Sequence, residues 1–296
     1  MRMGKIFYMK RSYLRLDRFL TLTVFRHLIG RGNSSDVHIP IFMYHSISDD
    51  SEDAEHPYYR VNTSPAVFAE HMKYLNDQHY KVITLDQVLE RINSNDNDKS
   101  KFVAITFDDG FRDFNERAFP ILRKYGFPAT VFLPVGLIGD QHEKFKGKEL
   151  LTWSEVRELR KEGVFFGSHS LTHKQMKLIG KEEVKQEIVQ SKNILEDKLD
   201  ERIDSFSYPY AFSQEDGKFT QYLKDILLKS GYRYGVSTRI GTTSLRDSRM
   251  FMKRIPINSC DDLVLLQAKL SGAYDWLYTL QNIFKLLKKY RLLGEK

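Results

Sequence analysis

Two short clusters of acidic and histidine residues are the parts of the sequence best suited to chemistry. The first is Thr106-Phe-Asp-Asp-Gly110, which places the adjacent carboxylates of Asp108 and Asp109 after an apolar run. Adjacent carboxylates repel each other, so a nearby cation would allow both to stay ionised. Gly110 would permit the tight backbone needed to bring both toward one point. Asp-Asp-Gly is also a common turn sequence, so the motif alone leaves both interpretations open.

The second cluster is His169-Ser-Leu-Thr-His173. Histidines four residues apart lie on one face of a helical turn, where two imidazoles can share a metal. Alone, such a pair can equally be structural. Two histidines and one carboxylate, with coordination positions left open, form a recurrent catalytic metal site. Both clusters follow predicted strands, which favours one joint site over two unrelated turns.

Composition limits the kind of metal site. The chain of 296 residues has 41% hydrophobic and 29% charged residues, as expected of an ordinary globular protein. Its single cysteine, Cys260, excludes an intrachain disulfide and a thiolate zinc site. Any metal must therefore be held by histidines and carboxylates.

Repeated strand-then-helix units would position these side chains. Alternation of this kind predicts parallel strands with outer helices, and seven or eight units favour an incomplete or distorted (β/α) barrel of about seven strands. In such a fold, chemistry occurs where strands end and loops begin. We expect strands at 37–44, 80–83, 102–107, 129–133, 164–167, 205–208, 232–237 and 250–255, and helices from 65 and at 85–92, 116–125, 153–161, 181–199, 218–230 and 261–271.

At these motifs the sequence resembles the polysaccharide deacetylase family, carbohydrate esterase family four. Residues 106–110 match its first motif, residues 169–173 its second, and Phe206-Ser-Tyr-Pro-Tyr210 its third. The order and spacing also fit, so the resemblance covers roughly residues 37–258.

The resemblance implies a role for each matching residue. Asp109, His169 and His173 would bind Zn²⁺ or another divalent ion such as Co²⁺, Ni²⁺ or Mn²⁺. Asp108 would be the general base that deprotonates a metal-bound water. The backbone N–H of Tyr210 would help to stabilise the oxyanion.

The third motif also supplies the expected substrate mouth. Tyr208, Pro209 and Tyr210 would border it, and the loop 139–148 is long enough to lie beside it. Aromatic rings at the mouth could stack on sugar rings or could simply pack. The rings in question belong to Tyr208, Tyr210, Phe111 and Phe212.

Two positions depart from the usual family pattern. An arginine that orients the catalytic aspartate normally stands where this chain has Ser207, and Arg254 could substitute for it. The usual late acid histidine is missing, because no histidine follows His173. The stretch Ile39-Pro-Ile-Phe-Met-Tyr-His45 resembles the opening strand of biofilm poly-N-acetylglucosamine deacetylases, in which the acid comes from the first strand. We therefore expect His45 to be the general acid.

These expectations define a hydrolase that removes N-acetyl groups from a polysaccharide, an oligosaccharide or a lipid-linked glycan. A catalytically silent saccharide-binding relative and a hydrolase of small non-sugar amides are the alternatives.

Basic charge is concentrated in the two ends of the chain. Residues 1–35 carry a net charge of +7 and residues 281–296 carry +4, so the body, 36–280, carries −4 against a total of +7. This distribution argues against nucleic acid as a partner. We expect a basic amphipathic extension at 1–35, a catalytic domain at 36–272 and a basic amphipathic helix at 273–296. Both ends would pack on the body or dock on an anionic membrane. Without a recognisable cleavable signal or membrane span, we expect a cytoplasmic protein that is either soluble or peripheral at the inner membrane face.

Overall fold

The computed structural model describes residues 14–28, 37–52, 55–94, 98, 100–211 and 216–283. Eight strands of this part of the chain form one sheet, in which all pairs are parallel. They are β1 (Ile41–Tyr44), β4 (Lys81–Val82), β5 (Phe102–Phe107), β6 (Thr130–Leu133), β9 (Phe165–Ser168), β10 (Ser205–Ser207), β11 (Tyr234–Ile240) and β12 (Met252–Pro256).

Seven of these strands close into a barrel. Their order is β1-β12-β11-β10-β9-β6-β5, and β5 pairs with β1 again, while β4 is added beside β5. The predicted barrel of about seven parallel strands is confirmed. The register shifts between β11 and β12, so the ring is closed but locally irregular.

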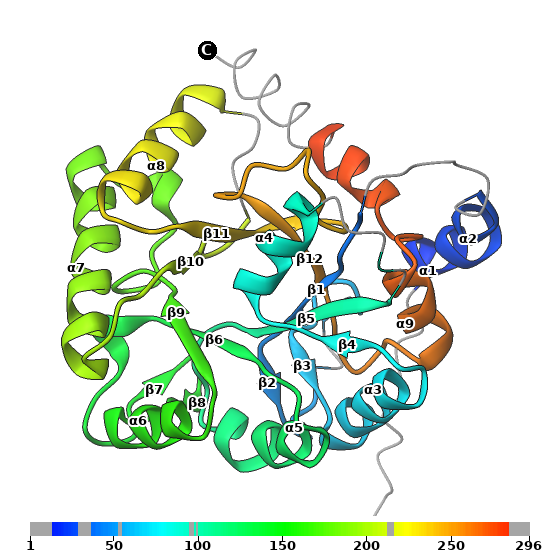
Figure 1. Ribbon diagram of the computed structural model, residues 1–296, viewed down its shortest axis with the longest axis horizontal. Coiled ribbons are helices and arrows are strands. Elements are labelled where there is room, and N and C mark those ends of the chain that lie inside the picture. The colour runs from blue at the N-terminus through cyan, green and yellow to red at the C-terminus, as the bar shows by residue number, and fades with distance from the viewer. Residues whose placement is uncertain are drawn as a thin grey trace, which may run out of the picture.

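Most of the helices surround the ring, while α4 (Leu85–Asn93) lies across its centre in the view of Figure 1. Their positions follow the predicted strand-then-helix alternation. They are α3 (Pro65–Asp77), α4 (Leu85–Asn93), the π-helical η3 (Phe114–Ala118) with α5 (Phe119–Tyr125), α6 (Trp153–Lys161), α7 (Lys181–Leu199), α8 (Gly217–Lys229) and α9 (Leu263–Leu270).

Local sequence signals explain where these helices begin. The Ser64 side chain caps α3 by accepting from the Val67 N–H, and Pro65 occupies the first turn. Thr152 and Glu155 form the predicted reciprocal capping box at the start of α6. Such caps satisfy N–H groups that a helix start leaves without intrahelical partners.

Parallel pairing gathers the carboxyl ends of the strands at one rim. Tyr44 at the end of β1 is in register with Phe107 at the end of β5, so His45 and Asp108 both follow at that rim. Leu133 of β6 is in register with Ser168 of β9, and the His169 N–H continues the ladder by donating to the Leu133 carbonyl at 2.7 Å.

Two small sheets that the sequence did not reveal lie outside the ring. β2 (Ser46–Ile47) pairs with β3 (Asn62–Thr63), and β7 (Lys144–Phe145) forms an antiparallel hairpin with β8 (Lys148–Glu149). Each strand has two residues, which is too short for an alternating pattern to be recognised.

The described parts of the two chain ends pack on the body. The N-terminal part contains α1 (Leu16–Leu20), the π-helical η1 (Thr21–Phe25) and α2 (Arg26–Leu28), and residues 276–283 are also helical. Trp276 joins the two ends, since its ring stacks on Phe25 at 4.7 Å and its Nε1 donates to Thr21 Oγ1 at 2.9 Å. Tyr274 Oη also donates to Asp17 at 2.9 Å. The rest of both expected amphipathic helices, residues 1–13, 29–36 and 284–296, lies outside the described residues.

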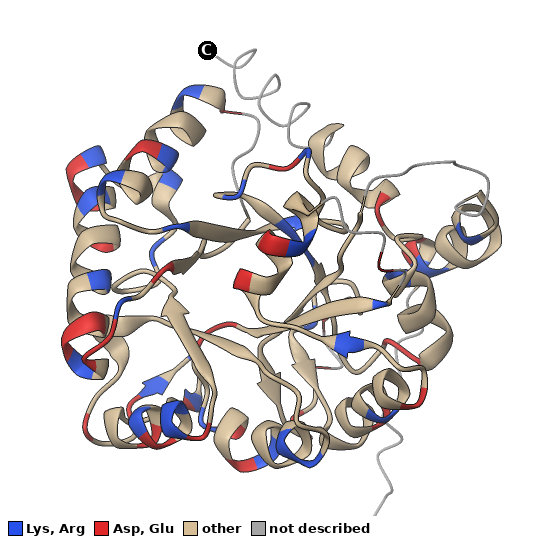
Figure 2. Ribbon diagram, viewed as in Figure 1, with Lys and Arg blue, Asp and Glu red and all other residues tan. Residues whose placement is uncertain are grey.

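Charged residues gather mainly on the outer helices and loops, while the barrel strands are largely free of them (Figure 2). Among the described helices, none has the length and apolar character needed to cross a bilayer.

Candidate active site

The two adjacent carboxylates that follow β5 are both buried, and the backbone turns sharply at the second of them. Asp108 is 2% exposed and Asp109 is 1% exposed. Asp109 has a left-handed backbone with a φ of 72°, and Gly110 follows with a φ of 65°. Non-glycine residues adopt this region only where the surrounding structure imposes it. The turn allows neighbouring side chains to contact different groups.

Asp108 is held by a fork of charged hydrogen bonds. The Nη1 and Nη2 atoms of Arg254 donate to its two carboxylate oxygens, each at 2.7 Å, and Ser207 Oγ donates at 3.2 Å. Burial raises the pKa of Asp108, but the charge and hydrogen bonds of Arg254 outweigh this effect and hold the pKa at about 2. Asp108 is therefore ionised at neutral pH.

Arg254 fills the space beside Ser207. It projects from β12, is fully buried, and also donates to Ser207 Oγ at 3.0 Å and to the Ser237 carbonyl at 3.1 Å. The small serine on β10 leaves room for an arginine that arrives from another strand. The contact that the sequence suggested for Arg254 is thus present.

Asp109 contacts the histidine motif instead. Its Oδ1 lies 3.0 Å from His173 Nε2 and 3.6 Å from His169 Nε2. All three residues are buried. Burial raises the pKa of Asp109, but His173, His45 and His169 outweigh it and hold the pKa well below its usual range. The predicted ligand residues therefore come together at one point.

The hydrogen bond made by His169 determines which of its ring nitrogens faces Asp109. Its Nδ1 lies 2.9 Å from the Ser207 carbonyl, which can only accept, so Nδ1 carries the proton. The lone pair on Nε2 then faces Asp109, as a metal ligand requires. Burial lowers the pKa of His169 to about 4, which keeps the ring neutral at physiological pH.

The prediction of a helical turn at residues 169–173 is wrong. Ser170 and His173 have left-handed φ angles of 67° and 57°, which a right-handed helix excludes. Serine side chains hold this loop: Ser168 Oγ accepts from the Ser170 N–H, and Ser170 Oγ accepts from the His173 N–H. The loop, and not helical periodicity, brings the two imidazoles together.

The three side chains fit a divalent metal ion. One ligand atom from each of Asp109, His169 and His173 lies within 4.8 Å of the other two. Tetrahedral zinc with bonds of about 2.0–2.1 Å places two ligands roughly 3.3 Å apart, and the two carboxylate–imidazole distances of 3.0 and 3.6 Å bracket that value. Two imidazole nitrogens and a carboxylate are also a donor set that zinc prefers.

His45 follows β1 directly and lines a cavity next to this cluster. Its strand lies beside the strand that leads to Asp108, as expected for a group at the same rim. Burial lowers the pKa of His45, while the charges of Asp109 and Asp108 act in the opposite direction.

Comparison with known proteins shows which proteins this chain resembles. Residues 95–235 match the polysaccharide deacetylase family, a range that contains all three motifs. Over 213 residues the chain is 29% identical to YxkH of Bacillus subtilis strain 168, a protein named as a polysaccharide deacetylase, with 72% of this chain and 68% of YxkH covered. The chain therefore contains a polysaccharide deacetylase domain. It is accordingly a hydrolase of the deacetylase class.

Other proteins are similar to this deacetylase in sequence or in fold. A Staphylococcus aureus poly-β-1,6-N-acetyl-D-glucosamine N-deacetylase is 26% identical over 210 residues, which cover 67% of this chain and 68% of that protein. The Streptococcus pyogenes deacetylase PplD, solved with acetate, has a TM-score of 0.69 at 25% identity, covering 80% of this chain and 99% of its own. IcaB from Ammonifex degensii shares the fold, with a TM-score of 0.64 at 18% identity over 79% of this chain and 97% of its own.

Within the deacetylase motif that ends β10, only one of the candidate aromatic rings is open to solvent. Tyr210 is 49% exposed, has a φ of 59°, and lies 4.8 Å from the His173 ring. Tyr208 and Pro209 are buried, and Tyr208 packs against Phe206 and Phe251. The expectation that Tyr208 could offer a ring face to a sugar is therefore wrong, because the core covers it.

Of the other two candidate rings, Phe111 is 3% exposed and stacks on Phe145, so it too is a packing residue. Phe212 lies outside the described residues.

The hairpin β7–β8 adds a residue that the sequence did not single out. Lys146 Nζ donates to Asp109 Oδ2 at 2.9 Å, and Phe145 lies 5.0 Å from the His173 ring. The loop 139–148 thus borders the deacetylase site, as its length suggested. Consecutive left-handed residues at the hairpin tip, Lys146 and Gly147, place the lysine there. The Lys-Gly pair is a weak turn signal, and nothing in the sequence connects it to Asp109.

Proposed function

We propose that this deacetylase is a metal-dependent enzyme that removes N-acetyl groups from an amino-sugar glycan. The proposal rests chiefly on one arrangement. A carboxylate clamped by Arg254 lies beside a separate Asp109–His169–His173 cluster with metal-ligand spacing. Hydrolysis of an amide at neutral pH needs both an activated water and stabilisation of negative charge on the acetyl oxygen.

Each site residue has a separate part in the proposed reaction. When bound by the cluster, a divalent ion would act as a Lewis acid toward the acetyl group and the attacking water. Asp108, ionised and fixed in orientation, accepts a proton from that water as its oxygen bonds to the acetyl carbon. The Tyr210 N–H donates to the oxygen on which charge develops. His45 donates a proton to the departing nitrogen as the C–N bond breaks, which yields acetate and a free amine.

Several observations support a glycan as the substrate. The Staphylococcus aureus relative is named for an N-acetylglucosamine polymer. Tyr210 offers an exposed aromatic ring next to the cluster, suited to packing on a sugar face. Zn²⁺ is the proposed ion, with Co²⁺, Ni²⁺ or Mn²⁺ as substitutes, because the donor set is two imidazoles and one carboxylate.

The two alternatives make different chemical predictions. A silent saccharide-binding relative would have lost a ligand or the base, whereas this chain retains Asp108 and all three proposed ligands. A hydrolase of small amides would need no glycan contact beyond the acetyl group.

Acetate release from N-acetylated oligosaccharides and from small N-acetyl amides tests the proposal. We expect release from the sugars, loss of activity after exhaustive chelation, recovery on adding Zn²⁺, and about one bound ion per chain. Full activity after chelation would overturn the metal mechanism. Sugar binding without any acetate release would favour the silent relative, and equal activity on small amides would remove the glycan preference.

We also propose that the basic chain ends dock on an anionic membrane surface. Their charge is opposite to that of the body, and the described part of the N-terminal segment exposes Leu16, Phe19 and Leu28. Basic residues interleaved with exposed apolar ones suit an interfacial segment. The protein should co-sediment with vesicles containing anionic lipid and bind less when both ends are deleted. Equal binding by the truncated chain, provided that it still folds by circular dichroism, would contradict this.

A further inference from the structure

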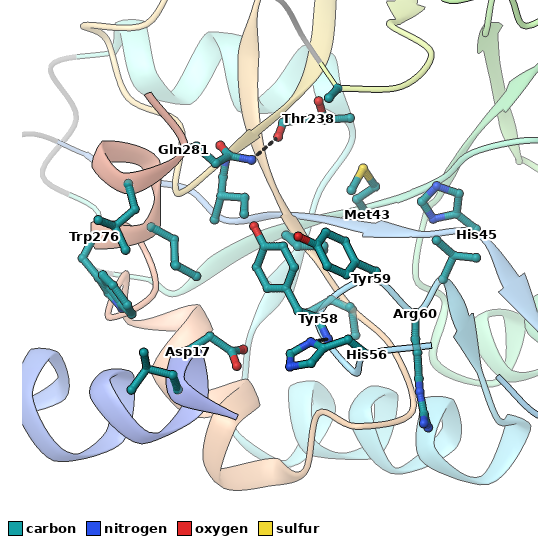
Figure 3. A pocket seen from close by; sticks show the side chains of 18 of the residues that line it. Asp17, Met43, His45, His56, Tyr58, Tyr59, Arg60, Thr238, Trp276 and Gln281 are labelled. Atoms are coloured by element: carbon teal, nitrogen blue, oxygen red, sulfur yellow. Dashed lines mark hydrogen bonds between the residues drawn. The ribbon is translucent and has the colours of Figure 1, made fainter. Parts of the chain in front are cut away.

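A large cavity opens between the barrel rim and the two chain ends. It has a volume of about 880 Å³, within the range of about 300–1,000 Å³ usual for small-molecule sites. Figure 3 shows His45 toward one side of it and Trp276 toward the other, with the rings of Tyr58 and Tyr59 between them. The cavity therefore runs from the proposed acid to the packed chain ends.

The lining of this cavity is chiefly apolar, and the rings of Tyr58, Tyr59, Tyr210 and Trp276 stand beside aliphatic side chains. The two chain ends and the ends of β1, β11 and β12 all contribute apolar side chains. They are Leu14, Leu16, Leu20, Met43, Val61, Ile240, Pro256, Ile257, Leu277 and Leu280.

Several polar groups in the wall are already paired with other groups of the protein. Asp17 accepts from Arg15 and Tyr274, and Gln281 bonds both to the Ile240 N–H and to the Thr238 carbonyl. A sugar ring needs hydrogen-bond partners for its hydroxyl groups, since burying them unpaired is costly. A hydrocarbon needs none. The wall thus favours a hydrocarbon over a further sugar ring.

The cavity is continuous with the candidate active site, because His45 and Tyr210 line it as well. A substrate whose acetamido group lies at Asp109 and His173 would therefore place its neighbouring substituent at the cavity entrance. Near the other end, Leu14 and Leu16 are 82% and 54% exposed, so the apolar lining continues to the protein surface.

We propose that this cavity binds an alkyl or acyl chain carried by the substrate, so that the preferred substrate is an amphiphilic N-acetylated amino sugar. The inference rests on the proposed deacetylation and specifies its substrate class. The sugar lies at the carboxylate and histidine cluster, and its hydrocarbon chain lies between the barrel rim and the packed chain ends.

Matched glycosides of N-acetylglucosamine with methyl, octyl and dodecyl groups test this inference below their critical micelle concentrations. Full burial of a methylene corresponds to about a fourfold gain. Burial of half of the seven additional methylenes of the octyl chain predicts a kcat/KM about 100-fold above that of the methyl glycoside. Equal kcat/KM for the three glycosides would overturn the inference.

A pair of tryptophan variants on the C-terminal helix locates the chain. Leu280 lines the cavity, while its neighbour Thr279 is exposed and does not. Leu280→Trp should reduce the octyl-to-methyl ratio of kcat/KM at least tenfold and leave the methyl glycoside unaffected, which also reports correct folding. Thr279→Trp should keep the wild-type ratio. An unchanged ratio in Leu280→Trp would place the chain elsewhere and overturn the inference; if that variant failed to fold, Leu16→Trp would replace it.

Binding of dodecyl glucoside, which has no acetamido group, separates this inference from the proposed function. Calorimetry should detect binding to the wild-type protein and at least tenfold weaker binding to Leu280→Trp. Such binding without acetate release from any glycoside would sink the deacetylation proposal and leave the hydrocarbon site standing. Acetate release with no chain-length effect and no dodecyl glucoside binding would support deacetylation and overturn the hydrocarbon site.

Discussion

Asp108 and Asp109 are neighbours in the chain, yet their environments differ in almost every respect. Asp108 is held by Arg254 and Ser207 in the barrel interior, whereas Asp109 faces two imidazoles and the Lys146 hairpin. The left-handed backbone at Asp109 separates them. Two identical side chains can thus take different roles, because the backbone turn between them directs each one toward different partners.

The sharpest test of this comparison exchanges each carboxylate for an amide. Asp109→Asn should lose metal affinity, because a carboxamide is a poorer ligand than a carboxylate. Asp108→Asn should retain the metal and lose turnover by about 10²–10⁴-fold, as is typical for a general base. Metal content and acetate release would be measured on both variants. Equal metal loss in the two variants would show that the roles are misassigned.

His45 adds a second proposed proton-handling group, beside Asp108, to the comparison. His45→Ala should leave metal content intact and lower kcat by about 10²-fold or more for an amide, whose nitrogen must be protonated to leave. Hydrolysis of p-nitrophenyl acetate should be largely spared, since its leaving group needs no proton. A matched variant, His169→Ala, should lose metal and both activities. If amide and ester hydrolysis fell equally in His45→Ala, the acid would have to be another residue.

Arg254 tests whether the rigid surroundings of Asp108 matter for catalysis. Arg254→Met leaves a buried carboxylate without its partner, so we expect the free energy of unfolding to fall by about 3–5 kcal/mol. Turnover should fall by roughly 10–100-fold with metal content unchanged, as for a residue that positions another. Denaturant unfolding and acetate release would measure the two effects.

The double variant Asp108→Asn/Arg254→Met provides the control for Arg254. It should recover part of the lost stability, because the unpaired charge is gone, while remaining inactive. Additive losses of stability in the double variant would mean that the two side chains are not energetically coupled.

Substitution of Lys146, which contacts Asp109, should have the smallest effect of the changes considered. Its ammonium group competes with a cation for Asp109, but its side chain is 44% exposed, so water screens the interaction. Lys146→Ala should therefore bind Zn²⁺ about two- to fivefold more tightly in a chelator competition assay. Lys144→Ala, an exposed change on the same hairpin, should leave affinity unaltered. Weaker metal binding by Lys146→Ala would indicate that the lysine supports the site and does not compete for it.

Site residues inside the family motifs are easier to recognise from the sequence than site residues outside them. The match to the deacetylase family spans residues 95–235, and both His45 and Arg254 lie outside it. They reach the site because the ring closes: β1 pairs with both β5 and β12. The assignments of roles, domain boundaries and cellular location remain predictions.

The sequence by itself determined the strand–helix alternation, the helix caps and the residue types of the site. These features follow from local periodicity and from motifs only a few residues long. The sequence offered Arg254 only as a possible partner, and the tertiary structure decided that it contacts Asp108 across 146 positions of chain. It also decided that left-handed turns aim Asp109 and His173 at each other, that Lys146 reaches Asp109, and that the chain ends enclose a cavity. Such contacts depend on barrel closure and on side-chain packing between distant segments, which local sequence patterns do not encode.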